Sequence, residues 1–259
     1  MRIAMGLEYD GTGFAGWETQ VDQRTVQSCA EAAVAKVADH PVKVVCAGRT
    51  DSGVHALSQV VHFDSEAPRD NDAWLLGTNA NLPADIRVRW AQPVDNEFHA
   101  RFSARRRSYR FVILNAGQKS ALHRHRVCWH YRPLDEARMA EAAQYLIGEH
   151  DFSSYRAQAC QAKNPVRTIY RLDVSRHGEF VHIDVVANAF LHHMVRNIAG
   201  VLMAVGEGKY RPDWAGEVLG YRDRTLGGVT APPQGLYLLG VEYPQHYRLP
   251  ACSARSLLL

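Results

Sequence analysis

The sequence predicts an α+β fold built from two halves that each follow the order β-α-β-β-α-β. Two observations predict it. Short runs rich in β-branched residues alternate with stretches whose apolar residues recur at helical spacing. The same order of elements then occurs a second time, without a letter-by-letter repeat. Such halves are ferredoxin-like, so we expect a mostly antiparallel sheet with helices on one face and a cleft between the halves.

The first half opens with a strand over residues 2–9 and a glycine-rich loop. Thr25 is predicted to cap a helix, because apolar residues follow it at helical spacing and Pro41 lies just past the end of that pattern. The other elements expected in this half are strands over residues 42–46, 59–63 and 86–90, and a short helix over residues 72–78 capped by Asn71 or Asp70.

The second half repeats the order. A helix capped by Asp135 runs to about Ile147, with Gly148 as its stop. The other helical patterns cover residues 190–205 and 212–219. Strands are expected over residues 109–114, 169–175, 180–187 and 236–243, the middle two joined at a His177-Gly178 turn. These elements place an N-terminal half over residues 1–104, a C-terminal half over residues 105–248 and a tail over residues 249–259.

The composition indicates a chain that can bury a substantial core, since 46% of its 259 residues are apolar. The net charge of +3 does not by itself indicate a nucleic-acid partner. The five cysteines are odd in number and form no C-x-x-C pair, which argues against a disulfide framework or a zinc site. No apolar run is long enough to cross a bilayer, and the first residues read as a strand, not a signal peptide. We therefore expect a cytoplasmic protein with no membrane association.

The most informative segment is AGRTDSGVHA, residues 47–56. It places Arg49 two residues before Asp51 in a loop between two β-branched runs, and glycines 48 and 53 let the backbone bend there. A neighbouring arginine favours the ionised form of a carboxylate. The loop therefore indicates a functional Asp51, although Asp-Ser-Gly is also an ordinary turn sequence.

Two further segments resemble ligand-binding patterns. Residues 11–16, GTGFAG, match the G-x-G-x-x-G pattern, but the next helix starts only near Val26, which argues against a dinucleotide site. Residues 98–111, FHARFSARRRSYRF, interleave five arginines with four aromatic residues. Cations hold phosphates and flat rings stack on bases, so this pattern favours a single-stranded nucleic acid, the alternative being a solvated charged edge beside a core strand.

Taken together, these segments resemble the TruA family of tRNA pseudouridine synthases. The resemblance covers nearly the whole chain, in order. Its matching segments are YDGTGFAGW (9–17), AGRTDSGVHA (47–56), QVVHF (59–63), NANLPADIRV (79–88), FHARFSARRRSYRF (98–111), HDFSSYR (150–156), ANAFLHHMVRNIAG (187–200) and GLYLLGVEY (235–243). Ser52 departs from the family, which usually has alanine there, and its hydroxyl could add a hydrogen bond to the loop.

The resemblance implies an isomerase that needs no cofactor and no metal. It implies that Asp51 is the catalytic carboxylate, acting either as a nucleophile on the sugar or as a base in a glycal route. Arg196 is then its charge partner, Arg49 lies near the flipped nucleotide, and Tyr109 stacks on the target uracil. Leu236 is the apolar residue that packs the pocket. The pair His192-His193 is not expected to bind metal, because neighbours on a helix point apart.

The resemblance also implies a partner. The substrate is tRNA, flipped at its anticodon stem-loop (positions 38, 39 and 40), and the enzyme is a homodimer. The alternative is a non-catalytic RNA-binding protein or tRNA-folding helper, which would keep the basic and aromatic residues without needing Asp51. The residues expected to contact RNA are Phe98, His99, Ala100, Arg101, Phe102, Arg69, Gln161 and Lys163.

Overall fold

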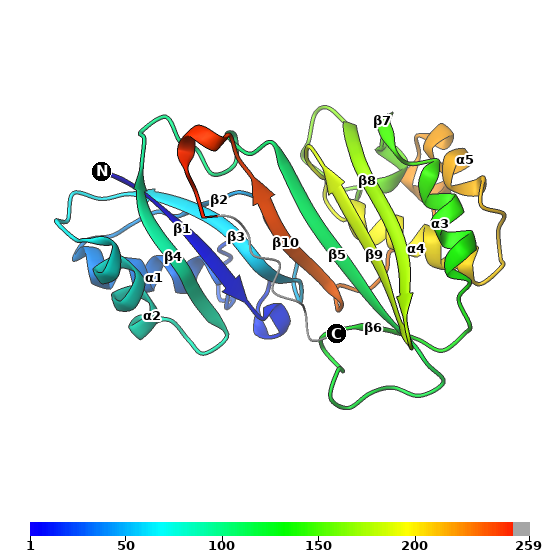
Figure 1. Ribbon diagram of the computed structural model, residues 1–259, viewed down its shortest axis with the longest axis horizontal. Coiled ribbons are helices and arrows are strands. Elements are labelled where there is room, and N and C mark those ends of the chain that lie inside the picture. The colour runs from blue at the N-terminus through cyan, green and yellow to red at the C-terminus, as the bar shows by residue number, and fades with distance from the viewer. Residues whose placement is uncertain (251–259) are drawn as a thin grey trace. The chain divides into compact units, whose positions relative to one another are not determined.

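The computed structural model describes residues 1–250 and contains two compact units (Figure 1). The first unit comprises Met1–Arg105 and the described residues from Tyr237 onward. The second unit comprises Arg106–Leu236. Of the predicted tail at 249–259, all but the first two residues lie outside the described part of the chain.

The sheet of the first unit has the strand order β4-β1-β3-β10, with the short β2 paired to β3. Strand β1 (Arg2–Tyr9) runs antiparallel to both β3 (His55–Asp64) and β4 (Ile86–Val94). β2 (Val45–Cys46) is also antiparallel to β3, whereas β10 (Leu236–Glu242) is parallel to it. The unit thus contains the predicted β-α-β-β-α-β order, with one further strand from the end of the chain.

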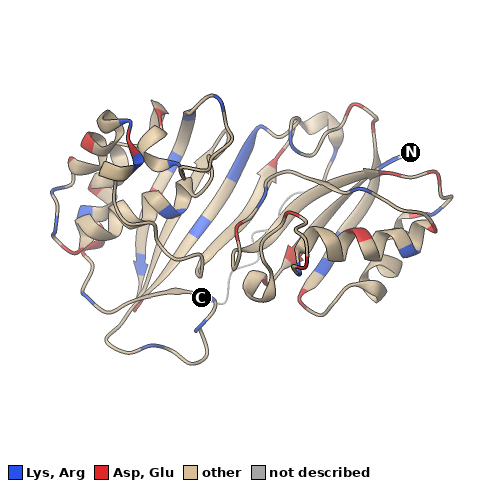
Figure 2. Ribbon diagram, turned by 180° about the vertical axis from the view of Figure 1, so that it is seen from behind, with Lys and Arg blue, Asp and Glu red and all other residues tan. Residues whose placement is uncertain are grey.

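Two helical segments cover one face of this sheet, as the views from the two sides show (Figure 2). Helix α1 (Val26–Ala38) begins after Thr25, whose hydroxyl accepts the Ser28 N–H in a capping box, as predicted. The second segment is a π-helical stretch, Ala73–Gly77, that continues into α2 (Thr78–Asn81). Asp70, one of its two predicted caps, accepts the Ala73 N–H at 2.7 Å.

The sheet of the second unit has the order β5-β9-β8-β7 and is antiparallel along that path. Its members are β5 (Arg106–Asn115), β9 (Phe180–Ala187), β8 (Val166–His177) and β7 (Gly148–Asp151). The short β6 (Cys128–His130) runs parallel to β5. The α+β class and the mostly antiparallel pairing are therefore confirmed, while β6 and β7 are additions to the predicted elements.

Helices α3 (Glu136–Gln144), α4 (Met194–Gly206) and α5 (Trp214–Tyr221) cover one face of the second sheet (Figure 2). Asp135 caps α3 through the N–H groups of its first turn, as predicted. The prediction that a helix starts at residue 190 is wrong, because His193 has a left-handed backbone with φ of 60° and α4 begins only after it.

The last strand does not stay with the half to which its position in the sequence assigned it. β10 pairs with β3 through Tyr237 opposite His55 and Leu238 opposite Ala56. Just past β10, the ring of Tyr243 lies 5.2 Å from that of Phe98, which is fully buried. Strand neighbours in a sheet are set by side-chain burial rather than by chain order, and here they bring the end of the chain to the first unit. No helix among residues 1–250 has the length and apolar character needed to cross a membrane.

Candidate active site

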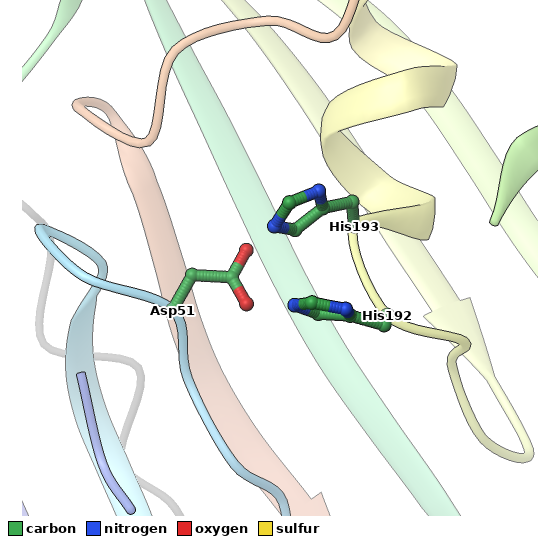
Figure 3. A group of neighbouring side chains, drawn as sticks. All are labelled: Asp51, His192 and His193. Atoms are coloured by element: carbon green, nitrogen blue, oxygen red, sulfur yellow. The ribbon is translucent and has the colours of Figure 1, made fainter. Parts of the chain in front are cut away.

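Asp51 lies on the loop between β2 and β3 and is half-buried (Figure 3). A single buried side chain fixes the start of this loop. Gln59 of β3 is fully buried and donates its amide N–H to the Gly48 carbonyl at 2.6 Å, while its Oε1 accepts the Gly48 N–H at 3.4 Å. Beyond Asp51 the Asp51 carbonyl accepts the Val54 N–H at 3.1 Å. The loop is therefore hydrogen-bonded on both sides of the carboxylate.

The glycine-rich segment after β1 packs directly on this loop. A Cβ at Gly11 would lie 2.0 Å from the Val54 carbonyl oxygen, and one at Gly16 would lie 2.8 Å from that of Thr50. Gly16 also has φ of +102°, which disfavours any other residue. The Trp17 N–H donates to the Thr50 carbonyl at 2.9 Å. These two glycines thus serve close backbone approach, and α1 starts at Val26, as the argument against a dinucleotide site expected.

Ser52 adds a hydrogen bond between the two segments. Its hydroxyl donates to the Phe14 carbonyl at 3.1 Å, which confirms the expectation for this departure from the family pattern. Thr50, which is buried, contributes in the same way through its hydroxyl, 2.8 Å from the Tyr9 hydroxyl. The Asp51 loop is consequently held by side chains on both of its flanks.

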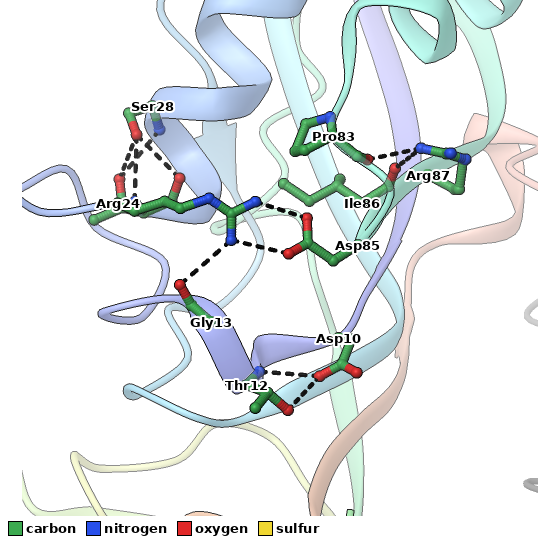
Figure 4. A network of polar contacts seen from close by, with 10 residues as sticks. Asp10, Thr12, Gly13, Arg24, Ser28, Pro83, Asp85, Ile86 and Arg87 are labelled. Atoms are coloured by element: carbon green, nitrogen blue, oxygen red, sulfur yellow. Dashed lines mark hydrogen bonds and ion pairs between the residues drawn. The ribbon is translucent and has the colours of Figure 1, made fainter. Parts of the chain in front are cut away.

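A bidentate ion pair secures the glycine-rich segment itself (Figure 4). Arg24 donates Nη1–H and Nη2–H to the two carboxylate oxygens of Asp85, each at 2.9 Å, and also reaches the Gly13 carbonyl at 3.3 Å. Its guanidinium lies 4.0 Å from the centre of the Phe14 ring. The side chain of Asp10 accepts the Thr12 N–H at the start of the segment.

Arg49 forms an ion pair that the sequence did not predict. Its Nη2–H donates to Oε1 of Glu18 at 2.8 Å, and its side chain is 59% exposed. Glu18 directly follows the YDGTGFAGW segment and carries no motif signal of its own. Arg49 is thus tied to the glycine-rich segment as well as to the loop that contains Asp51.

The second unit holds the other predicted pocket residues. Tyr109 lies on β5, is buried, and its ring meets that of Phe190 edge to face with centroids 4.9 Å apart. Leu236 is buried at the start of β10. Arg196 is half-buried in the first turn of α4, and its Nε–H donates to the Ala231 carbonyl at 2.8 Å.

A buried polar network fixes the segment that holds Arg196. The Ala231 N–H donates to the Arg196 carbonyl at 3.1 Å, and a Cβ at Gly200 would lie 1.7 Å from the Val229 carbonyl oxygen. Between these contacts, the Thr230 hydroxyl donates to Oδ1 of Asn197 at 2.6 Å.

Arg224 completes that network and was not identified from the sequence. Its Nη2 donates to the Thr230 hydroxyl at 2.7 Å and to Oδ1 of Asn197 at 3.1 Å. Burial lowers the pKa of the Arg224 guanidinium. In the sequence, Arg224 lies between α5 and the segment at Ala231 and belongs to no periodic pattern or motif.

His192 and His193 precede α4 (Figure 3). The premise that they point apart as helix neighbours is wrong, because His193 is the left-handed residue before the helix and the two ring centroids lie 4.0 Å apart. His192 is exposed and His193 half-buried.

The segment 98–102, predicted to contact RNA, divides into buried and exposed residues. Phe98 and Ala100 are fully buried and belong to a core cluster, so their side chains are turned away from solvent. Arg101 and Phe102 are exposed, and the Phe102 ring lies 4.4 Å from that of His99. Nδ1 of His99 accepts the N–H groups of both Arg101 and Phe102 at 3.2 Å, which fixes the turn.

Two further arginines of the segment 98–111 form contacts within the second unit, and three other residues predicted to contact RNA lie outside that segment. Arg110 forms a bidentate pair with Asp184, at 2.7 and 2.8 Å, and the buried Arg107 donates to the Asn188 carbonyl at 2.9 Å. These two arginines hold β5 to its surroundings within the second unit. Arg69, Gln161 and Lys163 are exposed, and Arg69 donates Nε–H to the Val37 carbonyl at 3.0 Å.

Comparisons with known proteins identify the relatives of this chain. Residues 6–103 and 142–244 match a family model described as tRNA pseudouridine synthase. The tRNA pseudouridine synthase A of Alcanivorax borkumensis is 58% identical over 250 residues, covering 96% of this chain and 94% of that protein. That of Nitrosococcus oceani is 57% identical and covers 98% of both chains. That of Vibrio cholerae is 52% identical over 259 residues, covering 100% of this chain and 98% of that protein.

Proposed function

The chain belongs to the family of tRNA pseudouridine synthases, and from this premise we propose that Asp51 is the catalytic carboxylate of its isomerase reaction. We further propose that the enzyme isomerises uridines in the anticodon stem-loop, at tRNA positions 38, 39 and 40. The observation that supports this role of Asp51 is the set of hydrogen bonds that hold its loop. Buried Gln59, Thr50 and the backbone of Trp17 hold the residues around it by hydrogen bonds, which preorganises one carboxylate for chemistry.

The reaction needs no redox partner. The bond between ribose C1′ and uracil N1 breaks, the base turns, and a bond forms between C1′ and C5. N1 gains a proton and C5 loses one, so the atoms and electrons balance within the nucleotide. An ionised carboxylate serves in either route, because it attacks C1′ in one and removes a sugar proton in the other.

In this proposal, other side chains bind the target nucleotide and support the charge of Asp51. Tyr109 packs against the target uracil, and the edge-to-face contact with Phe190 fixes its ring. Arg196 supports the charge of Asp51, and Leu236 contributes apolar surface to the pocket. Arg49, anchored by Glu18, lies near the extruded nucleotide or its phosphate.

RNA binding offsets the cost of extruding the base, which amounts to a few kcal/mol. We assign this role to the half-buried His99 and the exposed Arg101 and Phe102, while the buried Phe98 and Ala100 position the turn that presents them. Arg69, Gln161 and Lys163 are further proposed contacts. We also propose that the enzyme acts as a homodimer on tRNA in the cytoplasm.

The variant Asp51→Asn tests the proposal, with Asp22→Asn at an exposed position as its control. Asp51→Asn is expected to abolish pseudouridine formation in a tRNA transcript, because an amide neither attacks C1′ nor removes a sugar proton. Carbodiimide modification maps the product. Binding of the tRNA should stay within a fewfold of the unmodified protein. Turnover in Asp51→Asn equal to that of the control would exclude the carboxylate from the mechanism.

A further inference from the structure

A row of cations and aromatic rings runs across the surface of the second unit at β6. We call Lys119, Trp129, Tyr131, Arg132 and Lys209, with the carboxylate of Glu207, the β6 row. Each member contacts the next. Lys119 Nζ lies 4.9 Å from the centre of the Trp129 ring, and the rings of Trp129 and Tyr131 lie 5.9 Å apart.

The row continues past Tyr131 to the end of α4. The Arg132 guanidinium lies 5.5 Å from the Tyr131 ring centre and donates Nε–H to its hydroxyl at 2.9 Å. Arg132 and Lys209 both pair with Oε2 of Glu207, at 3.1 and 2.7 Å. The row thus forms an unbroken chain of contacts, and none of its residues was singled out in the sequence.

Hydrogen bonds and strand pairing hold the segment that presents the row. The Trp129 indole N–H donates to the Ala116 carbonyl at 3.0 Å, which fixes the plane of the ring. The amide of Asn115 donates to the carbonyls of both His130 and Arg132, at 3.1 and 2.6 Å. Pairing of β6 with β5 adds to these contacts. Side chains that are already held in place lose little conformational entropy when a ligand binds.

The chain segment that carries most of the row is basic. Residues 98–134 contain no Asp or Glu, and the segment 115–132 contributes Lys119, Arg124, Arg126 and Arg132 (Figure 2). The one carboxylate of the row is nearly buried, with 8% of the Glu207 side chain exposed, whereas the side chains of Arg132 and Lys209 are each 50% exposed. Burial by itself would raise the pKa of Glu207, but hydrogen bonds from Lys209 and Arg132 hold it below its usual value. Glu207 therefore orders the two cations while the positive charge faces solvent.

We propose that the β6 row is a second tRNA-binding surface, at which Lys119, Arg132 and Lys209 hold phosphates and the rings of Trp129 and Tyr131 stack on an unpaired base. Side by side, cations and exposed rings suit single-stranded RNA, because phosphates and base faces alternate along the strand. Tyr131 is 55% exposed and available for such stacking. This inference rests on the proposed function only in taking tRNA as the substrate, and it requires no role for Asp51.

The test compares tRNA binding by Lys119→Ala and Tyr131→Ala over a range of salt concentrations. Lys43→Ala and Tyr221→Ala, at exposed positions outside the row, are the matched controls. Lys119→Ala should lower the slope of log K against log salt by about one unit, because one phosphate contact is lost. Tyr131→Ala should raise Kd about fivefold or more without changing the slope, whereas Tyr131→Phe should keep most of the affinity because the ring remains. Kd, salt slope and kcat should not change in the two controls, Lys43→Ala and Tyr221→Ala.

Several outcomes would overturn the proposal. Wild-type Kd and salt slope in both Lys119→Ala and Tyr131→Ala would show that tRNA does not touch the row. A change in molecular mass by light scattering in Tyr131→Ala would instead assign the face to contact with a second copy of the chain. Unchanged binding in these variants, combined with loss of turnover in Asp51→Asn, would remove the surface while leaving the proposed function intact.

Discussion

Gln59 is the side chain on which the conformation of the Asp51 loop most directly depends. It is fully buried, and its amide hydrogen-bonds to both the N–H and the carbonyl of Gly48. It opens the matching segment QVVHF, but neither its spacing nor its residue type indicates what its amide binds. The motif predicted the loop and its carboxylate, but the amide that holds the loop became visible only in the structure.

Replacing Gln59 with leucine is therefore expected to impair both folding and catalysis. The change leaves the N–H and carbonyl of Gly48 without partners, which costs about 1–3 kcal/mol of unfolding free energy. It should also lower kcat, because Asp51 lies three residues further along the same loop. Urea unfolding and single-turnover rates measure the two effects, with Gln23→Leu at an exposed site as control. An unchanged kcat in Gln59→Leu would show that the hydrogen bonds between Gln59 and Gly48 do not position Asp51.

His62 makes the stability of the first unit depend on pH. Burial, with the neighbouring charge of Arg2, lowers the pKa of His62 to about 4, and its Nδ1 accepts the Ala100 N–H at 3.1 Å only when that nitrogen is unprotonated. In the unfolded chain the group titrates near its ordinary value, around 6.5. Between these two pH values the unfolded state binds the additional proton, so acid favours unfolding.

We therefore expect the contribution of His62 to the unfolding free energy to be constant above about pH 7 and to fall as the pH drops from about 6.5 to 4. The loss due to His62 is on the order of 3 kcal/mol. His62→Gln, which keeps an acceptor for Ala100, should flatten this part of the profile, measured by urea unfolding at several pH values. If His62→Gln and the exposed control His125→Gln give the same profile as the unmodified protein, another group is responsible.

At the scale of elements, α4 and the segment that ends at Ala231 act together. Periodicity predicted a helix here, but it began too early, because apolar residues such as the buried Leu191 recur at the same spacing in the preceding loop. Strands β6 and β7 have three and four residues, too few for an alternating pattern to show. By contrast, β1 and α1 matched their predicted starts, because a run of strand length and a cap with helical spacing are both local signals.

The Arg224 network predicts a positioning effect on Arg196. Arg224→Gln removes the hydrogen bonds to Thr230 and Asn197, so the segment that receives the Arg196 guanidinium loses its anchor. We expect kcat to fall while KM changes little, and the effect should be smaller than additive with that of Arg196→Lys. Steady-state kinetics of the two single variants and the double variant measure this coupling. Full additivity, or an equal loss in the exposed control Arg222→Gln, would contradict it.

At the scale of the whole molecule, the chain returns to its first unit at the end. The sequence predicted halves over residues 1–104 and 105–248, whereas the units of the structure are Met1–Arg105 with the described residues from Tyr237 onward, and Arg106–Leu236. It did not indicate that β10 leaves the second half, because a strand's hydrophobic pattern does not specify its neighbour. Hydrogen bonds also join this last segment to the first unit. The Arg105 N–H donates to the Glu242 carbonyl at 2.7 Å, and the Tyr243 hydroxyl donates to the Ala100 carbonyl at 2.6 Å.

A fragment of residues 1–105 should accordingly be incomplete. Without β10 the edge of β3 at His55 is unpaired, and the Phe98 ring loses its contacts with Tyr243 and Tyr247. We expect the fragment to unfold at a lower urea concentration than the full chain, and a peptide of residues 236–250 added in trans to raise its midpoint. Circular dichroism follows both transitions. No response to the peptide, against a scrambled peptide as control, would show that the unit is complete without it.

This return of the chain also bears on its synthesis. β10 begins at Leu236, so the ribosome must synthesise the whole second unit before the first sheet can close. Until then the nascent chain carries an open strand edge, the kind of surface that recruits other chains. Translation that stops early, anywhere before this strand, therefore releases a product whose oldest part has never finished folding.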